Sequence, residues 1–291
     1  MMKRYITQAK EELEQIVDFL LLNGNLSPNK GLINGEMGVA IFFFHYWKFT
    51  QNELFYDYAF ALLEDIQDQI HLESPTDYEN GLLGIGVGLN YLVKNRLIKV
   101  ENDCFEDLDN LMNKLLYSKY RHTYTLYNGL IGDGYYWLFR YYNSKESYQI
   151  IANLNYILKK IDEETINITL NELFDVRIFL SKLYAILEFR NKVVDILYNQ
   201  RFRRIDDDIV NNSFLYGEND ILMKEMVRQM KEDVFLKHKT FIDWNSYYSR
   251  YTNNSKCVKL SSNLGLLGYT GEAFLRLSLF ENSITDWVKI M

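Results

Sequence analysis

The sequence predicts an all-α fold of helix pairs arranged as an α/α toroid (a helix-pair barrel) with six units. Three observations predict this class. A motif of two glycines three residues apart, followed by apolar residues, occurs four times along the 291 residues. The chain holds only 2 prolines, so little interrupts long helices. It is also 48% hydrophobic, with 23 Tyr and 18 Phe, which is enough for a large core.

The four copies of this glycine motif set the period of the chain. They read GLINGEMGVAIFFF from Gly31, DYENGLLGIGVGLNYL from Asp77, TLYNGLIGDGYYWLF from Thr125 and SSNLGLLGYTGEAFLRL from Ser261. Their glycine pairs are Gly35 and Gly38, Gly81 and Gly84, Gly129 and Gly132, and Gly265 and Gly268. The first glycines are 46, 48 and 136 residues apart, and the last spacing is close to three periods. The period predicts six units that begin near residues 31, 77, 125, 171, 214 and 261, with the fourth and fifth degenerate.

Each element follows from the local pattern. Residues 5–22 carry apolar residues on one helical face, and Asn23-Gly24-Asn25 ends this helix. Every unit then predicts an apolar first helix and an amphipathic second helix. The expected pairs are 38–49 with 56–70, 82–94 with 103–117, and 130–142 with 145–161. Residues 171–189 carry an apolar helix without the glycines, and the fifth unit keeps only Gly217.

Helix pairs either stack as an open superhelix or close into a ring. The more apolar first helices suit an inner ring, and helix 5–22 can pack beside residues 283–291 to close the circle. We therefore expect residues 1–291 to form a single toroid domain, with the open solenoid as the alternative. The role of the Tyr-rich stretch 245–262 stays open.

Composition excludes several classes of protein. The net charge of −7 argues against a nucleic-acid binder and against a basic membrane-surface protein. Two cysteines, Cys104 and Cys257, are too few for a disulfide framework, which fits a reducing compartment. The N-terminal sequence lacks the pattern of a signal peptide, and the most apolar run, 37–47, is too short to span a bilayer. We expect a cytoplasmic protein without a membrane span.

The motif has an architectural interpretation. Asn34, Asn80 and Asn128 directly precede the first glycines and are predicted to cap the following helices. The glycines are predicted to let the first turn lie tightly against a neighbouring backbone.

A functional interpretation stands beside it. If the inner helices are parallel, their N-termini gather at one mouth of the ring and favour anionic or acceptor-rich groups such as peptide carbonyls. The acidic and polar side chains expected at this mouth, as a peptide-binding or cation-binding rim, are Glu36, Glu79, Tyr127, Asp133, Glu218, Asp220, Asn263 and Glu272. For each of them the competing interpretation is an ordinary solvated residue at a helix start.

The repeated glycine motif before apolar helices resembles that of the lanthionine synthetase C-like family, over nearly the whole chain. The resemblance implies an α/α toroid. It also implies a central zinc that activates peptide cysteines for addition to dehydrated residues, which makes the thioether rings of lanthipeptides. In the typical cyclases the zinc ligands are Cys and His residues directly before motif glycines. The matching positions here are Ile33-Asn34, Glu79-Asn80, Tyr127-Asn128, Leu215-Tyr216 and Asn263-Leu264. None is Cys or His, so we expect no metal and no other cofactor.

Three functions follow as hypotheses. The first is a zinc-free cyclase-like or scaffold protein of lanthipeptide-type maturation, which binds a precursor peptide or its modifying enzymes. If it is an enzyme, its activity is a zinc-independent lanthionine cyclase-like one. The second is an α/α-barrel hydrolase that acts on a carbohydrate or peptide through acidic rim residues. The third is an inert interaction module.

Overall fold

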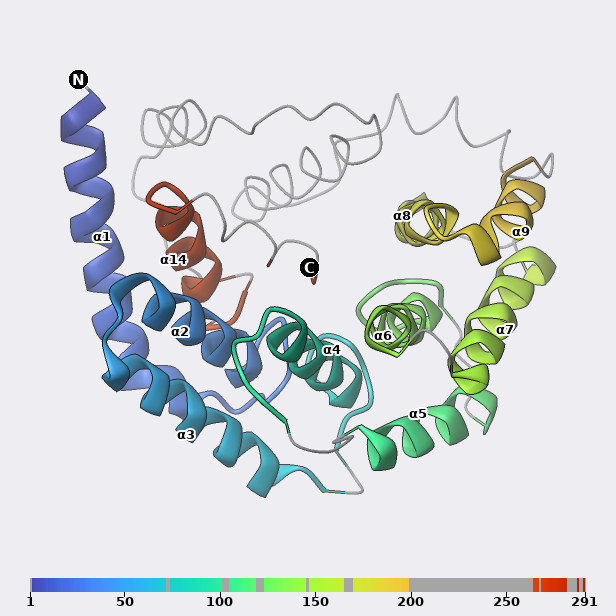
Figure 1. The fold of residues 1–291 in the computed structure, drawn as a ribbon, viewed down its shortest axis with the longest axis horizontal. Helices are drawn as coiled ribbons and strands as arrows, with labels where there is room; N and C mark the ends of the chain where they lie inside the picture. Colours follow the sequence, from blue (N-terminus) through green and yellow to red (C-terminus); the bar gives the residue numbers. More distant parts are fainter. Residues whose placement is uncertain are drawn as a thin grey trace. The chain divides into compact units, whose positions relative to one another are not determined.

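The structure is a computed structural model that describes residues 2–71, 74–100, 105–118, 123–144, 147–164, 170–198 and 264–281 without 267, together with Trp287 and Ile290. All regular elements in these residues are helices (Figure 1). The predicted all-α class is therefore confirmed for the described part of the chain. The fifth sequence repeat, with the stretch 245–262, lies outside it.

The chain divides into two compact units, Met1–Pro75 with Gly217–Met291, and Thr76–Tyr216. The described helices of the first unit are α1 (Met2–Asn23), the 3-10 helix η1 (Gly24–Leu26), α2 (Glu36–Thr50), α3 (Glu53–Gln69) and α14 (Tyr269–Ser278). Those of the second unit are α4 (Leu82–Lys94), α5 (Glu106–Ser118), α6 (Leu130–Asn143), α7 (Tyr148–Glu164), α8 (Leu170–Tyr184) and α9 (Leu187–Tyr198).

The predicted helix pairs of the first three sequence repeats are confirmed, as α2 with α3, α4 with α5, and α6 with α7. The fourth sequence repeat is also a helix pair, α8 with α9, although it lacks the glycines. The apolar helix expected over 171–189 is wrong in its end, because α8 ends at Tyr184. A turn follows there, in which Ile186 N donates to Leu183 O over 2.9 Å, and α9 begins at Leu187.

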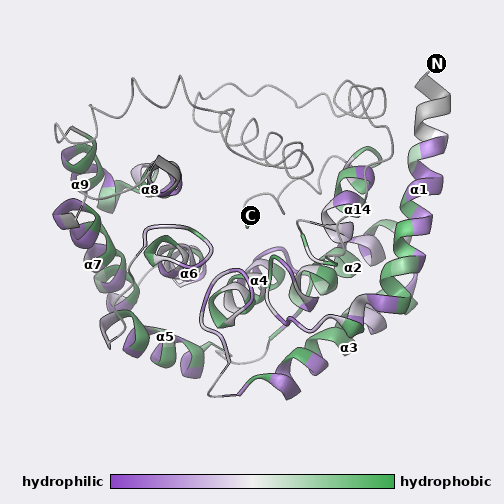
Figure 2. Ribbon diagram, turned by 180° about the vertical axis from the view of Figure 1, so that it is seen from behind, coloured by the Kyte–Doolittle hydropathy of each residue, from purple (hydrophilic) through white to green (hydrophobic). Residues whose placement is uncertain are grey.

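Burial separates the first helix of each pair from the second. In α2 every residue from Glu36 to Tyr46 is buried, whereas α3 buries only Ala59, Leu62 and Ile66. The second helices are amphipathic, and α7 carries hydrophobic residues on one side and hydrophilic residues on the other (Figure 2). The first, apolar helix of each pair thus lies in the core of its compact unit, and the second helix covers the core.

In the first unit, the N-terminal helix lies against the last described helix. Phe19 of α1 stacks on Tyr269 of α14 with ring centroids 4.3 Å apart. Nearer the start of α1, Glu12 Oε2 pairs with Arg276 of α14 at 3.0 Å. Segments from the two ends of the sequence therefore share one core.

In the second unit, a third glycine follows the motif in two copies. A Cβ on Gly86 of α4 would lie 2.5 Å from the Tyr136 ring of α6, and a Cβ on Gly134 of α6 would lie 2.6 Å from the Phe179 ring of α8. Each first helix thus offers bare backbone to an aromatic side chain of the next first helix. This spacing, Gly-x-x-Gly-x-Gly, is visible in the sequence, but its packing role was not predicted.

Candidate functional site

The candidate site is the set of loops that carry the glycine motif, 27–35, 76–81, 123–129 and 264–268, with the first helical turns that follow them. We call them the motif loops. In the first three sequence repeats, the first helix begins directly after the first glycine of its motif. Gly35, Gly81 and Gly129 are therefore the N-caps of α2, α4 and α6. The last copy differs, because α14 begins three residues later and its N-cap is the second glycine, Gly268.

The predicted Asn caps are wrong. The cap residues of α2, α4 and α6 are the glycines, which make no side-chain cap bond, and Asn34, Asn80 and Asn128 precede them. The motif loop itself supplies the acceptors instead. Glu36 N donates to Asn29 O over 3.1 Å, and Leu130 N donates to Thr123 O over 3.0 Å, in both cases seven residues upstream. A backbone carbonyl therefore satisfies an N–H group that would otherwise lack an intrahelical partner.

The glycines permit this close loop, as predicted. A Cβ on Gly38 would lie 2.6 Å from Leu32 O, and a Cβ on Gly132 would lie 2.5 Å from Leu126 O. The carbonyl is six residues upstream in both cases. Real side chains do not approach a backbone this closely, so these positions require glycine.

Within the first unit, the first and last motif loops touch. A Cβ on Gly265 would collide with Ile33 O and with the Asn34 backbone, and a Cβ on Gly38 would lie 3.0 Å from Leu266 Cγ. Thr270, at the start of α14, donates from both its backbone N–H and its hydroxyl to Leu264 O. The starts of α2 and α14 therefore lie together.

Within the second unit, the second and third motif loops are joined by a backbone hydrogen bond, from Tyr78 N to Tyr127 O at 2.9 Å. The third motif loop is hydrogen-bonded in turn to α8, the first helix of the degenerate fourth sequence repeat. Glu172 Oε1 accepts from Tyr124 N at 2.9 Å, and Asp175 Oδ2 accepts from Leu126 N at 2.8 Å. Carboxylates of α8 thus bind loop amides.

The predicted rim residues fall into two groups. Glu36, Asp133 and Glu272 are buried, with exposed fractions of 0%, 1% and 7%. Glu79 and Tyr127, on the second and third motif loops, are half-buried and keep part of their surface in solvent. The structure brings Glu36 and Glu272 into the first unit, and Glu79, Tyr127 and Asp133 into the second. Glu218, Asp220 and Asn263 lie outside the described residues.

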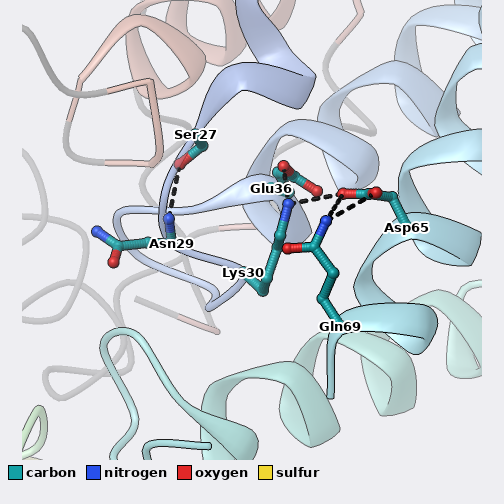
Figure 3. Close-up of polar contacts among 6 residues, drawn as sticks. All are labelled: Ser27, Asn29, Lys30, Glu36, Asp65 and Gln69. Carbon is teal, nitrogen blue, oxygen red and sulfur yellow. Dashed lines mark hydrogen bonds and ion pairs between the residues drawn. The ribbon is translucent and has the colours of Figure 1, made fainter. Parts of the chain in front are cut away.

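The buried Glu36 belongs to an ion cluster that the sequence did not reveal. Lys30 Nζ, from the first motif loop, lies between the carboxylates of Glu36 and of Asp65 on α3 (Figure 3). It bonds Glu36 Oε1 and lies 2.6 Å from Asp65 Oδ2. Gln69 Nε2 donates to the same Asp65 carboxylate at 2.9 and 3.1 Å. The cluster therefore ties the loop, the start of α2 and α3 together.

The two carboxyl groups of this cluster titrate differently. Burial raises the pKa of Glu36 to about 7, with the nearby Asp65 carboxylate adding to the rise, although the Lys30 ammonium opposes it. The Lys30 hydrogen bond lowers the pKa of Asp65. Burial lowers the pKa of Lys30, but the carboxylates of Asp65 and Glu36 together raise it above its ordinary value. The more exposed carboxyl thus keeps its charge, and the buried one holds its proton more firmly.

Glu272 is likewise held by an internal partner. Arg276, one turn further along α14, donates from Nη1 to Glu272 Oε2 at 2.5 Å and from Nε to Glu12 Oε2 on α1 at 3.0 Å. The two ion clusters of the first unit therefore join its elements to one another. Sequence spacing could have suggested the Glu272–Arg276 pair, which is one helical turn apart, but not Lys30 with Asp65, which are distant in the chain.

The positions that correspond to the zinc ligands of the family do not fit zinc. Ile33 is fully buried and apolar, and its neighbour is Asn34. The second and third loops place Glu79-Asn80 and Tyr127-Asn128 there, without thiolate or imidazole. In the described ranges no three His, Cys, Asp or Glu side chains are grouped so that they could hold a metal ion.

No helix in the described part of the chain has the length and apolar character needed to cross a membrane. No curated protein and no solved structure matches the chain. The model of the family described as lanthionine synthetase C-like protein matches residues 28–174, just over half of the 291 residues. The matched region contains the first three motif loops and their helix pairs, and these are consistent with the α/α toroid predicted for the chain. The chain therefore belongs to the lanthionine synthetase C-like family.

Proposed function

We propose that this protein acts in the maturation of ribosomally made, lanthipeptide-type peptides, without zinc. In this role it binds a precursor peptide or its modifying enzymes as a cyclase-like or partner protein. One observation carries the proposal. The motif loops keep the close backbone contacts of their glycines, while the positions that hold zinc ligands in the typical cyclases carry apolar, amide, acidic and phenolic side chains.

These two halves of the motif serve different purposes. The loop carbonyls that accept from the first helical amides, Asn29 O and Thr123 O, lie close against Gly35 and Gly129, so these glycines serve the architecture whatever the chemistry. The side chains directly before the first glycines do not make these capping bonds. Their replacement removes zinc coordination and leaves the scaffold intact, which suits a protein that binds a peptide rather than one that activates a thiol through a metal.

Glu79 and Tyr127 are the proposed peptide contacts. They lie on two loops joined by the Tyr78–Tyr127 backbone bond, and both side chains keep part of their surface in solvent. A carboxylate and a phenol hydroxyl can accept and donate hydrogen bonds to peptide amides and to hydroxyl side chains. Glu36 and Asp133 are buried, which argues against the alternative of an acid/base hydrolase that uses these carboxyls on a substrate.

The test is a calorimetric titration of the full chain with each precursor peptide encoded beside its gene, and with the neighbouring modifying enzymes. Glu79→Gln and Tyr127→Phe should weaken binding, and Glu106→Gln, at the exposed start of α5, should leave it unchanged. Absence of binding to every such peptide and enzyme would overturn the proposal. Metal analysis of the purified protein is the second test, and one zinc per chain would contradict zinc-free action.

A further inference from the structure

The Lys30–Glu36–Asp65 cluster has an unusual charge balance for a site that contains a fully buried carboxyl. Two carboxylates share one ammonium, and the side chain of Glu36 is completely buried. Glu36 Oε1 accepts from Lys30, whereas the buried Oε2 accepts no hydrogen bond from any described residue. With both carboxyls ionised the cluster carries one net negative charge, and a buried unbalanced charge is costly.

A proton on Glu36 removes that imbalance. The cluster then holds one ammonium and one carboxylate, with Lys30 paired to Asp65 at 2.6 Å. A protonated Glu36 can also share a hydrogen bond with the Asp65 carboxylate, which two ionised carboxylates cannot form. Asp65 remains the ionised member, because it is partly exposed and also accepts two hydrogen bonds from Gln69.

The other charged groups in the described part of the first unit do not provide a substitute partner. On α3, Tyr58 interacts electrostatically with Glu36, but its hydroxyl donates to Leu20 O at 2.9 Å. On α14, Arg276 is bonded to Glu272 and to Glu12 of α1. The 3-10 helix η1, Gly24–Leu26, contains no titratable side chain. Among the described residues, Lys30 and Asp65 are therefore the charges that control Glu36.

The position of Glu36 links this proton to the motif loop. Glu36 is the first residue of α2, and its backbone N–H donates to Asn29 O in the loop that carries Lys30. The next amide, Met37 N, is 3.4 Å from Lys30 O. Repulsion between two ionised carboxylates would act on the loop at both its backbone and its side-chain contacts.

We propose that Glu36 takes up and releases a proton and acts as a latch, which holds the first motif loop against α2 and α3 when protonated and loosens it when ionised. The proton comes from and returns to solvent. This inference is independent of the proposed peptide partner. It predicts that the described start of α2 is more stable in slightly acidic than in alkaline solution.

The test compares the wild type with Glu36→Gln, which mimics the protonated side chain. Because the folded protein holds a proton that the unfolded chain releases at a lower pH, stability should fall as pH rises from about 4.5 to about 7. The unfolding constant of the wild type should rise by up to tenfold per pH unit relative to the variant in this window. Glu106→Gln, an exposed carboxylate at the start of α5, should follow the wild type.

A parallel pH dependence of the wild type and Glu36→Gln would overturn the proposal. If Glu36→Gln does not fold, carbon-13 NMR of the glutamate carboxyls in the wild type replaces it. One resonance should titrate near neutral pH, and Asp65→Asn should move its midpoint to lower pH, because one carboxylate would then have the ammonium to itself. Absence of such a resonance, or a midpoint that Asp65→Asn leaves in place, would equally exclude the latch.

Discussion

Arg140 on α6 donates to both carboxylate oxygens of Asp109 on α5. Its Nε lies 2.9 and 3.0 Å from Oδ1 and Oδ2, and its Nη2 lies 2.6 Å from Oδ2. Tyr136 adds a hydroxyl donor at 2.6 Å, and the Arg140 guanidinium lies 4.3 Å from the centre of the Phe105 ring. This bidentate pair fixes the covering helix of the second pair to the core helix of the third.

Asp109→Asn should therefore lower the free energy of unfolding by about 3 kcal/mol, because the change leaves the buried Arg140 without its carboxylate. Chemical denaturation of both proteins measures the difference. Asp107→Asn is the matched control, since Asp107 is exposed on the same helix and its replacement should change stability by less than about 0.5 kcal/mol. Equal effects of the two variants would show that the pair adds nothing beyond surface charge.

Gly132→Ala should destabilise the protein by about 2 kcal/mol, because its Cβ would lie 2.5 Å from Leu126 O and 3.1 Å from Tyr78 Cβ. The sign is the informative part of the result. An uncrowded helical glycine would gain about 1 kcal/mol on the same change through helix propensity. A stabilised variant in thermal or urea unfolding would contradict the close contact between loop and helix.

Two asparagines test how the helices are capped. Asn52 is the N-cap of α3 and accepts from Leu54 N at 3.2 Å, so Asn52→Ala should cost about 1 kcal/mol. Asn128 is exposed before the glycine cap of α6, whose first amide is bound by Thr123 O, so Asn128→Ala should have almost no effect. Urea unfolding distinguishes the two variants. A loss at Asn128 as large as that at Asn52 would restore the side-chain cap that the sequence predicted.

Lys30→Met should destabilise the first unit by about 3 kcal/mol at neutral pH, because it leaves two carboxyls without the ammonium between them. The pKa of Glu36 should rise further, since Lys30 is what lowers it. A carboxyl with a raised pKa loses stability as pH increases, so the deficit should be larger at pH 8 than at pH 5.

The matched control for Lys30→Met is Lys10→Met, because Lys10 and Glu14 form an exposed pair on α1 that should contribute less than about 0.5 kcal/mol. Unfolding at several pH values separates the two variants. A deficit in Lys30→Met that is the same at every pH would show that the ammonium contributes packing rather than charge balance.

The sequence predicted the helices well where periodicity and turn chemistry agree. The helix over 82–94 was predicted with the bounds that α4 has, and α2, α3 and α6 differ from their predicted bounds by a few residues. The apolar character of the first helices predicted their burial. The glycine spacing predicted a close approach of backbone. Glycine inside a helix costs stability, so its repetition at the same place indicates a steric demand.

The candidate site was predictable only in part. The sequence identified the motif loops and showed that no Cys or His stands at the corresponding ligand positions. It did not show that Glu36 would be fully buried or that Glu79 would stay half-buried, because both lie within two residues of a motif glycine and look equally polar. Nor did it reveal Asp65 or Glu172, since each meets its partner from a different helix pair or loop.

The sequence alone thus determined the helical class, the repeat and the chemistry that the motif loops lack, because these depend on local pattern and residue type. Only the tertiary structure decided what caps the helices and which acidic residues are paired. Loop carbonyls replace the Asn side chains as caps because the glycines let the loop approach within hydrogen-bonding distance. Lys30 meets Asp65 because α3 folds back on α2, and a charge that is distant in the chain then fixes the protonation of Glu36.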